Sequence, residues 1–81
     1  MAKTTTEQHP LKLRVGANIR RHRERRKLTI TQCATLAGIT EIGWRKYEGG
    51  ERWPRPEHWQ SIADALRVTP ATLLLAGEKN S

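Results

Sequence analysis

The 81 residues of the chain suffice for one small domain, and a hydrophobic content of 36% allows a compact core with little margin. Lys and Arg number 15 against 8 Asp and Glu, and the formal net charge of +7 favours a polyanionic partner such as nucleic acid. No apolar run approaches the roughly 20 residues of a membrane span, so no membrane partner is expected.

The sequence has no cluster of reactive or metal-binding side chains. Cys33 is the one cysteine, and His9, His22 and His58 lack the spacing of metal ligands. We therefore expect no enzyme activity, no metal and no cofactor. Without a disulfide or a signal-peptide pattern, a cytoplasmic location is expected.

Residues 1–10 are polar and lack periodicity, which predicts a flexible N-terminal arm, then a domain at 11–76 and a tail at 77–81. From Leu11 to Lys27 the pattern is helical, with Val15 and Ile19 on one side. Six of the last eight residues of this helix are basic: Arg20, Arg21, Arg23, Arg25, Arg26 and Lys27. They favour contact with nucleic acid, and a solvated basic face is the alternative.

The next segment carries the signals of a short helix that ends at about Ala37. Thr29 and Gln32 match a capping box, in which each side chain bonds the backbone N–H of the other residue. Cys33 and Leu36 are predicted on the apolar side of this helix, with Cys33 as a small core residue and not a nucleophile.

A second short helix is predicted from the cap Thr40 to the glycine pair at 49–50, since glycine readily takes the left-handed conformation at a helix C-terminus. Trp44 and Tyr47 recur on its inner side. Two short helices joined by a tight turn at Gly38 are the arrangement of a helix-turn-helix, which places its second helix in the major groove of DNA.

Beyond a loop with two prolines at 51–56, apolar residues at three- and four-residue spacing predict a helix over 56–66. Thr69 and Pro70 then open a last helix as its cap and first residue, and 73–75, all leucine, form its apolar side. Because no strand signal or internal repeat is present, the predicted fold class is all-α, a compact bundle of about five helices.

This register resembles the Cro/phage-repressor-type, or XRE-type, helix-turn-helix family. The residues that carry the resemblance are Val15, Gly16, Ile19, Leu28, Thr29, Ala34, Leu36, Gly38, Ile39, Thr40, Trp44, Tyr47, Glu48, Gly49, Gly50, Arg52, Pro54, Ile62, Ala63, Ala65, Leu66, Val68 and Thr69. The resemblance implies a lambda-repressor-like DNA-binding domain and a bacterial or phage-encoded regulator.

In that family an arginine of the first helix pairs with the glutamate that ends the recognition helix. The resemblance implies this structural ion pair for Arg23 and Glu48, with a phosphate contact as the alternative for Arg23. Three positions depart from the family pattern. Ile30 replaces a polar phosphate-binding residue, His22 a core leucine, and Gly43 a small hydroxyl residue.

Base contacts are predicted on the side of the second short helix that faces away from the core. These residues are Thr40, Glu41, Ile42, Arg45 and Lys46. Glu41 can accept from a cytosine amino group and Ile42 can pack on a thymine methyl, while Arg45 could read guanine or hold phosphate. For Glu41, a role as helix-dipole partner alone is the alternative.

Phosphate contacts are predicted at the start of the first short helix, whose free N–H groups favour anions, and in and after the second. These residues are Thr29, Thr31, Gln32, Gly43, Arg52, Trp53 and Arg55. Trp53, between two arginines, marks either a sugar–phosphate contact or a partner surface.

The expected function is that of a sequence-specific double-stranded DNA-binding transcriptional regulator, a repressor. A homodimer on a pseudo-palindromic operator is expected, because one helix-turn-helix reads only a few base pairs. The predicted dimer surface is 68–76, and closure of the monomer core is the alternative for 73–75. An antitoxin-like or other protein-interaction module on the same fold is the alternative function, which Ile30, Ile42, Gly43 and Trp53 favour.

Overall fold

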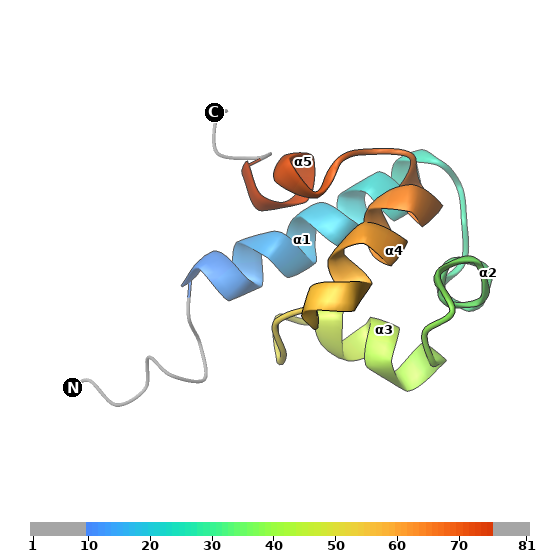
Figure 1. Ribbon diagram of the computed structural model, residues 1–81, viewed down its shortest axis with the longest axis horizontal. Coiled ribbons are helices and arrows are strands. Elements are labelled where there is room, and N and C mark those ends of the chain that lie inside the picture. Colours follow the sequence, from blue (N-terminus) through green and yellow to red (C-terminus); the bar gives the residue numbers. More distant parts are fainter. Residues whose placement is uncertain (1–9, 76–81) are drawn as a thin grey trace.

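The computed structural model describes residues 10–75, which form five α-helices and no strand (Figure 1). The helices are α1 (Pro10–Arg25), α2 (Ile30–Ala37), α3 (Glu41–Glu48), α4 (Pro56–Leu66) and α5 (Pro70–Leu75). In Figure 1, α1 runs through the bundle with α5 above it and α3 below, while α2 lies at one end against α3 and α4. The predicted all-α class is confirmed.

The bounds of α1 differ slightly from the prediction. The helix begins at Pro10, where the missing N–H of proline costs no hydrogen bond because first-turn N–H groups have no partner in the helix. It ends at Arg25, before Lys27, because Lys27 takes a left-handed φ of 59°. The arm was predicted at 1–10, but Pro10 belongs to α1; its other residues, 1–9, lie outside the described residues, as do Ala76 and the predicted tail at 77–81.

The capping box predicted at the start of α2 is confirmed. The N–H of Gln32 donates to Thr29 Oγ1 at 3.0 Å, and the N–H of Thr29 donates to Gln32 Oε1 at 2.8 Å. Gly38 follows α2 with a left-handed φ of 70°, which turns the chain toward α3. At the end of α3, Gly50 is left-handed with φ of 74°, whereas Gly49 keeps a helical φ of −79°. The prediction for the glycine pair therefore holds for its second member.

The core gathers buried residues from all five helices and the α2–α3 turn. They are Val15, Ile19, Cys33, Ala34, Ile39, Trp44, Tyr47, Ile62, Ala63, Leu66 and Leu73. Leu36 does not belong to it, and its predicted place on the apolar side of α2 is wrong, because its side chain is 64% exposed. Residues two apart on a helix point about 200° apart, so with Ala34 in the core Leu36 faces outward.

Helix α1 and the end of α3 approach each other closely at Gly16. A Cβ at Gly16 would lie 2.5 Å from the carbonyl oxygen of Tyr47 and 2.6 Å from that of Glu48. Gly50 is constrained in the same way, since its Cβ would lie 2.5 Å from Leu13 Cδ2. Gly16 weakens α1 as an isolated helix, but it is the residue that lets α3 pack against α1.

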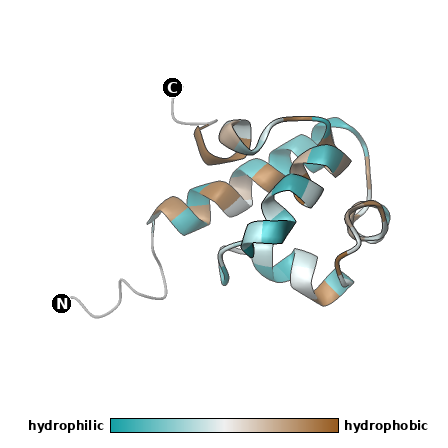
Figure 2. Ribbon diagram, viewed as in Figure 1, coloured by the Kyte–Doolittle hydropathy of each residue, from teal (hydrophilic) through white to brown (hydrophobic). Residues whose placement is uncertain are grey.

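Helix α5 closes the bundle. Leu73 is buried in the core, and its carbonyl oxygen accepts from Asn18 Nδ2 of α1 at 2.7 Å. Asn18 is itself buried, so α1 and α5 are joined by a polar contact that the sequence pattern did not indicate. Leu74 and Leu75 remain on the surface, and Figure 2 shows the end of α5 as an apolar brown segment.

Candidate nucleic-acid interface

Helix α3 has a buried side and an exposed side. Trp44 and Tyr47 are buried in the core and hold the helix in place. On the opposite side Ile42 is 67% exposed, and Arg45 is exposed as well. The exposed side is thus available to a partner while the backbone that carries it is fixed by packing.

The position of α3 is also held by an ion pair at its C-terminal end. Arg23 Nε donates to Glu48 Oε2 at 2.6 Å and Arg23 Nη2 to Glu48 Oε1 at 3.1 Å, with side-chain exposures of 13% and 7%. The indole N–H of Trp44 donates to the same carboxylate at 2.6 Å. Hydrogen bonding to Glu48 raises the pKa of Arg23 against the opposing effect of burial. Since Arg23 Nη1 also donates to the Leu28 carbonyl oxygen at 2.9 Å, this guanidinium serves mainly to join α1, the loop between α1 and α2, and α3.

The N-terminal end of α3 is tied to α2. Thr31 Oγ1 of α2 donates to the Glu41 carboxylate, which leaves Glu41 half-buried. The hydroxyl of Thr40 accepts from the N–H of Gly43 at 3.0 Å as the cap of α3. Two predicted base contacts therefore also have structural bonds, and the predicted phosphate contact Thr31 is the partner of one of them.

Gly43 is constrained by the same cap. A Cβ at Gly43 would lie 3.0 Å from Thr40 Oγ1 and 3.3 Å from Ile39 Cγ2. The absence of a side chain is therefore explained within the chain, before any approach to a phosphate. Lys46, a further predicted base contact, is half-buried next to the turn that follows α3.

The first turn of α2 presents backbone donors. Its capping box uses the Thr29 hydroxyl as acceptor for the Gln32 N–H and the Gln32 Oε1 as acceptor for the Thr29 N–H. The N–H groups of Ile30 and Thr31 have no partner inside the helix, because the first turn lacks preceding carbonyls. Gln32 is one of the predicted phosphate contacts at this turn. Because its Oε1 already accepts from Thr29, its side-chain amide NH2 is the group left to donate to a ligand.

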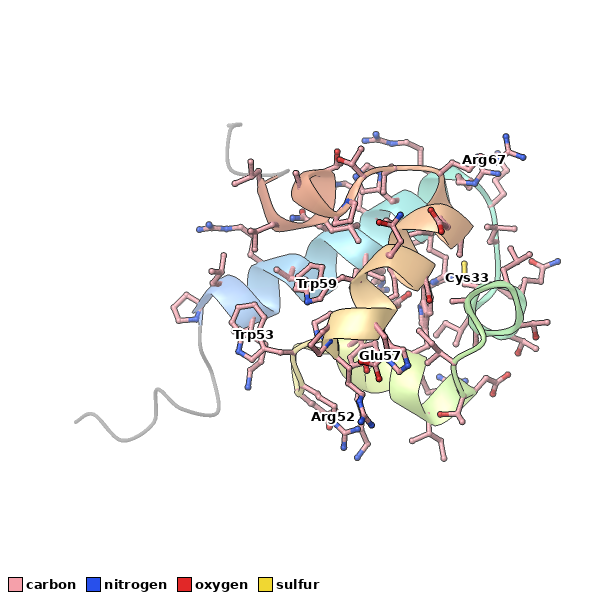
Figure 3. The ribbon with its side chains drawn as sticks, in the orientation of Figure 1. Cys33, Arg52, Trp53, Glu57, Trp59 and Arg67 are labelled. Carbon is pink, nitrogen blue, oxygen red and sulfur yellow. The ribbon has the colours of Figure 1, made fainter. Side chains whose placement is uncertain are left out.

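The loop between α3 and α4 presents Arg52, Trp53 and Arg55, all exposed. Figure 3 shows Arg52 pointing away from the bundle beside α3, whereas Trp53 lies next to the first half of α1, on the side remote from α2. Arg55 pairs with Glu57 at 3.4 Å on the open surface.

Two hollows were not expected from the sequence. The first measures about 290 Å³ and is lined by Arg20, Arg23, Ile30, Arg45, Glu48 and Gly49. The sequence pattern assigns Arg20 only to the basic run, although its three-residue spacing from Arg23 places both on one side of α1. The second measures about 360 Å³ on the outer side of α2 and is lined by Leu28, Thr31, Gln32, Thr35 and Leu36.

Two other titratable groups of the described residues have a shifted pKa. Burial raises the pKa of the Cys33 thiol, which keeps it protonated as a core residue. Burial, with Arg25 and then Arg21 close by, lowers the pKa of the partly buried His22. Within residues 10–75, no three His, Cys, Asp or Glu side chains are grouped to hold a metal ion. The helices in that range include none with the length and hydrophobicity for crossing a membrane.

Comparison with known proteins agrees with this arrangement. The model of a family described as a helix-turn-helix domain matches residues 14–76. The HTH-type transcriptional repressor RghR of Bacillus subtilis (strain 168) is 39% identical over 54 residues, which are 65% of this chain and 40% of that protein. The chain thus spans about two fifths of the length of this curated relative.

Solved structures share the fold. The controller protein C.AhdI from Aeromonas hydrophila has a TM-score of 0.73 at 24% identity, over 75% of this chain and 92% of its own. The clp gene regulator ClgR from C. glutamicum has a TM-score of 0.76 at 24% sequence identity, over 86% of this chain and 94% of its own. The P22 c2 repressor, solved with a synthetic operator, has a TM-score of 0.71 at 25% sequence identity, over 74% of this chain and 91% of its own. The chain belongs to the helix-turn-helix domain family, and within it to the Cro/phage-repressor, or XRE, type.

Proposed function

We propose that the chain is a sequence-specific DNA-binding transcriptional regulator, a repressor, that inserts α3 into the major groove of duplex DNA. The observation that carries this proposal is the division of α3, in which Trp44 and Tyr47 lock one side into the core and Ile42 projects from the other. The net charge of +7 favours a polyanion. The relative described as a transcriptional repressor and the P22 c2 repressor solved with a synthetic operator support the same function. A cytoplasmic location is part of the proposal.

In this proposal the exposed side of α3 reads bases. Ile42 packs on a thymine methyl and Glu41 accepts from a cytosine amino group, with Thr40 and Lys46 beside them. Backbone phosphates contact the free N–H groups at the start of α2 and the exposed side chains Thr29, Thr31, Gln32, Arg52, Trp53 and Arg55. Phosphate lies over Gly43 where the backbone of α3 comes closest to DNA.

We infer that two copies bind one operator. Leu75 at the end of α5 is 60% exposed and Leu74 lies beside it on the surface, whereas Leu73 is buried. The proposed dimer surface is α5 with its flanks, and Leu73 serves the monomer core instead. Two copies with two-fold symmetry would bind half-sites about 10 base pairs apart, centre to centre.

Selection of bound sites from random duplex DNA tests the proposal. We expect a pseudo-palindromic site, and the mass of the complex on the selected duplex should correspond to two chains. One chain per site would refute the dimer and leave DNA binding intact. Equal affinity for the selected pool and for random duplex would refute sequence-specific regulation.

A second candidate function is docking of another protein, in the manner of an antitoxin-like module. The apolar hollow on α2, with Leu28 and the 64% exposed Leu36 at its edges, favours it. A failed selection from random DNA would favour this candidate. Retention of duplex binding by Leu36→Glu would assign the hollow to a surface other than the DNA interface.

A further inference from the structure

The hollow between α1, the start of α2 and α3 carries an excess of positive charge. Its lining includes three arginines, Arg20, Arg23 and Arg45, and one glutamate, Glu48. Because Arg23 and Glu48 form a bidentate pair, they largely neutralise each other. The net charge of the hollow therefore comes from Arg20 and Arg45, which reach it from different helices.

Both of these arginines have guanidinium N–H groups that are available to a ligand. Arg20 Nε donates to Glu24 at 3.0 Å, but the two side chains are more than half exposed, and such surface pairs contribute little. Within residues 10–75, Arg45 has no ion-pair partner. A guanidinium carries five N–H donors in a planar fork that matches the oxygens of a phosphate. An anion entering the hollow would meet unused donors from two sides.

The start of α2 adds backbone donors to the same place. Ile30 is the first residue of α2 and also lines the hollow. Its side chain offers no hydrogen bond, but the first-turn N–H groups point outward and carry the positive end of the helix dipole. The arginines supply the charge that the side chain of Ile30 lacks.

We propose that Arg20 and Arg45 together hold one backbone phosphate of duplex DNA in this hollow. The inference deepens the proposed function and depends on it. DNA is the source of the phosphate because Arg45 stands three residues from Ile42, at the edge of the side of α3 that would enter the groove. A phosphate bordering that groove lies beside Arg45. Arg45 then positions the protein on the backbone and does not read guanine, and Arg20 joins the interface.

Neutral substitution of single phosphates tests the assignment. The duplex is a site selected by the wild-type chain, and each phosphate in turn is replaced by an uncharged methylphosphonate. For the wild type, we expect one position in each half-site where affinity falls roughly tenfold, the order expected for losing hydrogen bonds to a charged group. The double variant R20Q/R45Q should bind the unmodified duplex more weakly and be insensitive to that one substitution.

Matched controls separate this contact from general charge. Arg67→Gln removes an exposed arginine from the end of α4, remote from α3 in Figure 3, and should keep the wild-type sensitivity at every phosphate. Arg45→Lys keeps the charge without the planar fork and should retain part of the sensitivity. The base preference of Arg45→Gln should equal that of the wild type. Circular dichroism melting verifies that all variants are folded at the assay temperature.

The outcomes separate failure of the phosphate contact from failure of DNA binding itself. If the double variant loses affinity at the same methylphosphonate as the wild type, the phosphate assignment is wrong and DNA binding stands. A changed base preference in Arg45→Gln would also overturn it, in favour of guanine reading. If the wild type binds no duplex at all, the proposed function fails, and the inference fails with it.

Discussion

The two sides of helix α3 differ in how tightly their surroundings constrain them. On the buried side, Trp44, Tyr47 and Glu48 contact α1, α4 and the core, and the backbone carbonyls of the last two residues lie against Gly16. On the opposite side, Ile42 and Arg45 are exposed and are not part of the core. One eight-residue helix thus combines a side that decides whether the domain folds with a side that can change without unfolding it.

This difference explains how the fold can keep its geometry while its binding preference varies. The ion pair and the close approach at Gly16 set the position and tilt of α3 relative to α1. The backbone of the exposed residues is therefore held in place, and only the chemical nature of their side chains has to suit the partner. Variants on the two sides should therefore separate stability from recognition.

The largest loss of stability is expected from Glu48→Ala. The substitution leaves Arg23 and the indole of Trp44 without their acceptor, and removing one partner of a buried pair costs about 3–5 kcal/mol. Chemical denaturation of Glu48→Ala, Arg23→Ala and the double variant measures the loss. The double variant should lose less than the sum of the single losses. Strictly additive losses would contradict a coupled pair.

Gly16→Ala should follow, with a loss of about 1–3 kcal/mol from overpacking against the end of α3. Alanine raises helix propensity, so the sign of the change tests whether the close approach outweighs it. Gly49→Ala is the matched control, because its Cβ would meet its nearest neighbour, the Arg45 carbonyl oxygen, at 3.3 Å. Stabilisation by Gly16→Ala would mean that α1 and α3 lie further apart.

For His22, a partly buried residue of α1, we expect a smaller effect on stability that depends on pH. The folded state lowers the pKa of His22 from its usual 6.5 through burial and the neighbouring arginines. The unfolded chain therefore takes up the proton first as the pH falls, so stability is full above that value and decreases below it. Denaturation at about pH 7.5 and about pH 5.5 should show a larger decrease for the wild type than for His22→Gln. Equal decreases would show that His22 does not contribute.

Ile42→Ala should change stability least, by no more than about 0.5 kcal/mol, because its side chain is largely exposed. Its effect should appear in recognition, as a loss of about 1–3 kcal/mol of discrimination at one base pair. Competition between variants of the selected duplex measures this, with Glu41→Ala in parallel. An unchanged preference would remove Ile42 from base reading and weaken the contrast between the two sides of α3.

Signals between close neighbours in the chain were sufficient for much of the fold. The capping box of Thr29 and Gln32, the turn at Gly38 and the cap at Thr40 were predicted from residue types at fixed offsets. Such interactions involve atoms a few residues apart, so the local sequence contains both partners. The inward direction of Trp44 and Tyr47 also followed from helical periodicity alone.

Contacts between distant segments were harder to predict from the sequence. Leu36 was placed inside because leucine is apolar, yet the rotation of α2 is set by how Cys33 and Ala34 pack on other helices. Glycine weakens an isolated helix, and only the packing of the folded domain shows that Gly16 lets α3 lie against α1. The pair of Arg23 and Glu48 was foreseen only through a family resemblance, since 25 residues separate its members.

The sequence by itself determined the number of helices, the N-terminal caps of α2 and α3, the turn between these two helices and the basic character of the surface. These depend on local hydrogen bonds, helical period and composition, which are all readable along the chain. Only the tertiary structure decided that Arg20 and Arg45 share one hollow, that Asn18 bonds the last turn of α5 and that Leu36 stays outside. Those facts depend on the angles and distances at which helices pack, and packing is settled by all the side chains of the core together.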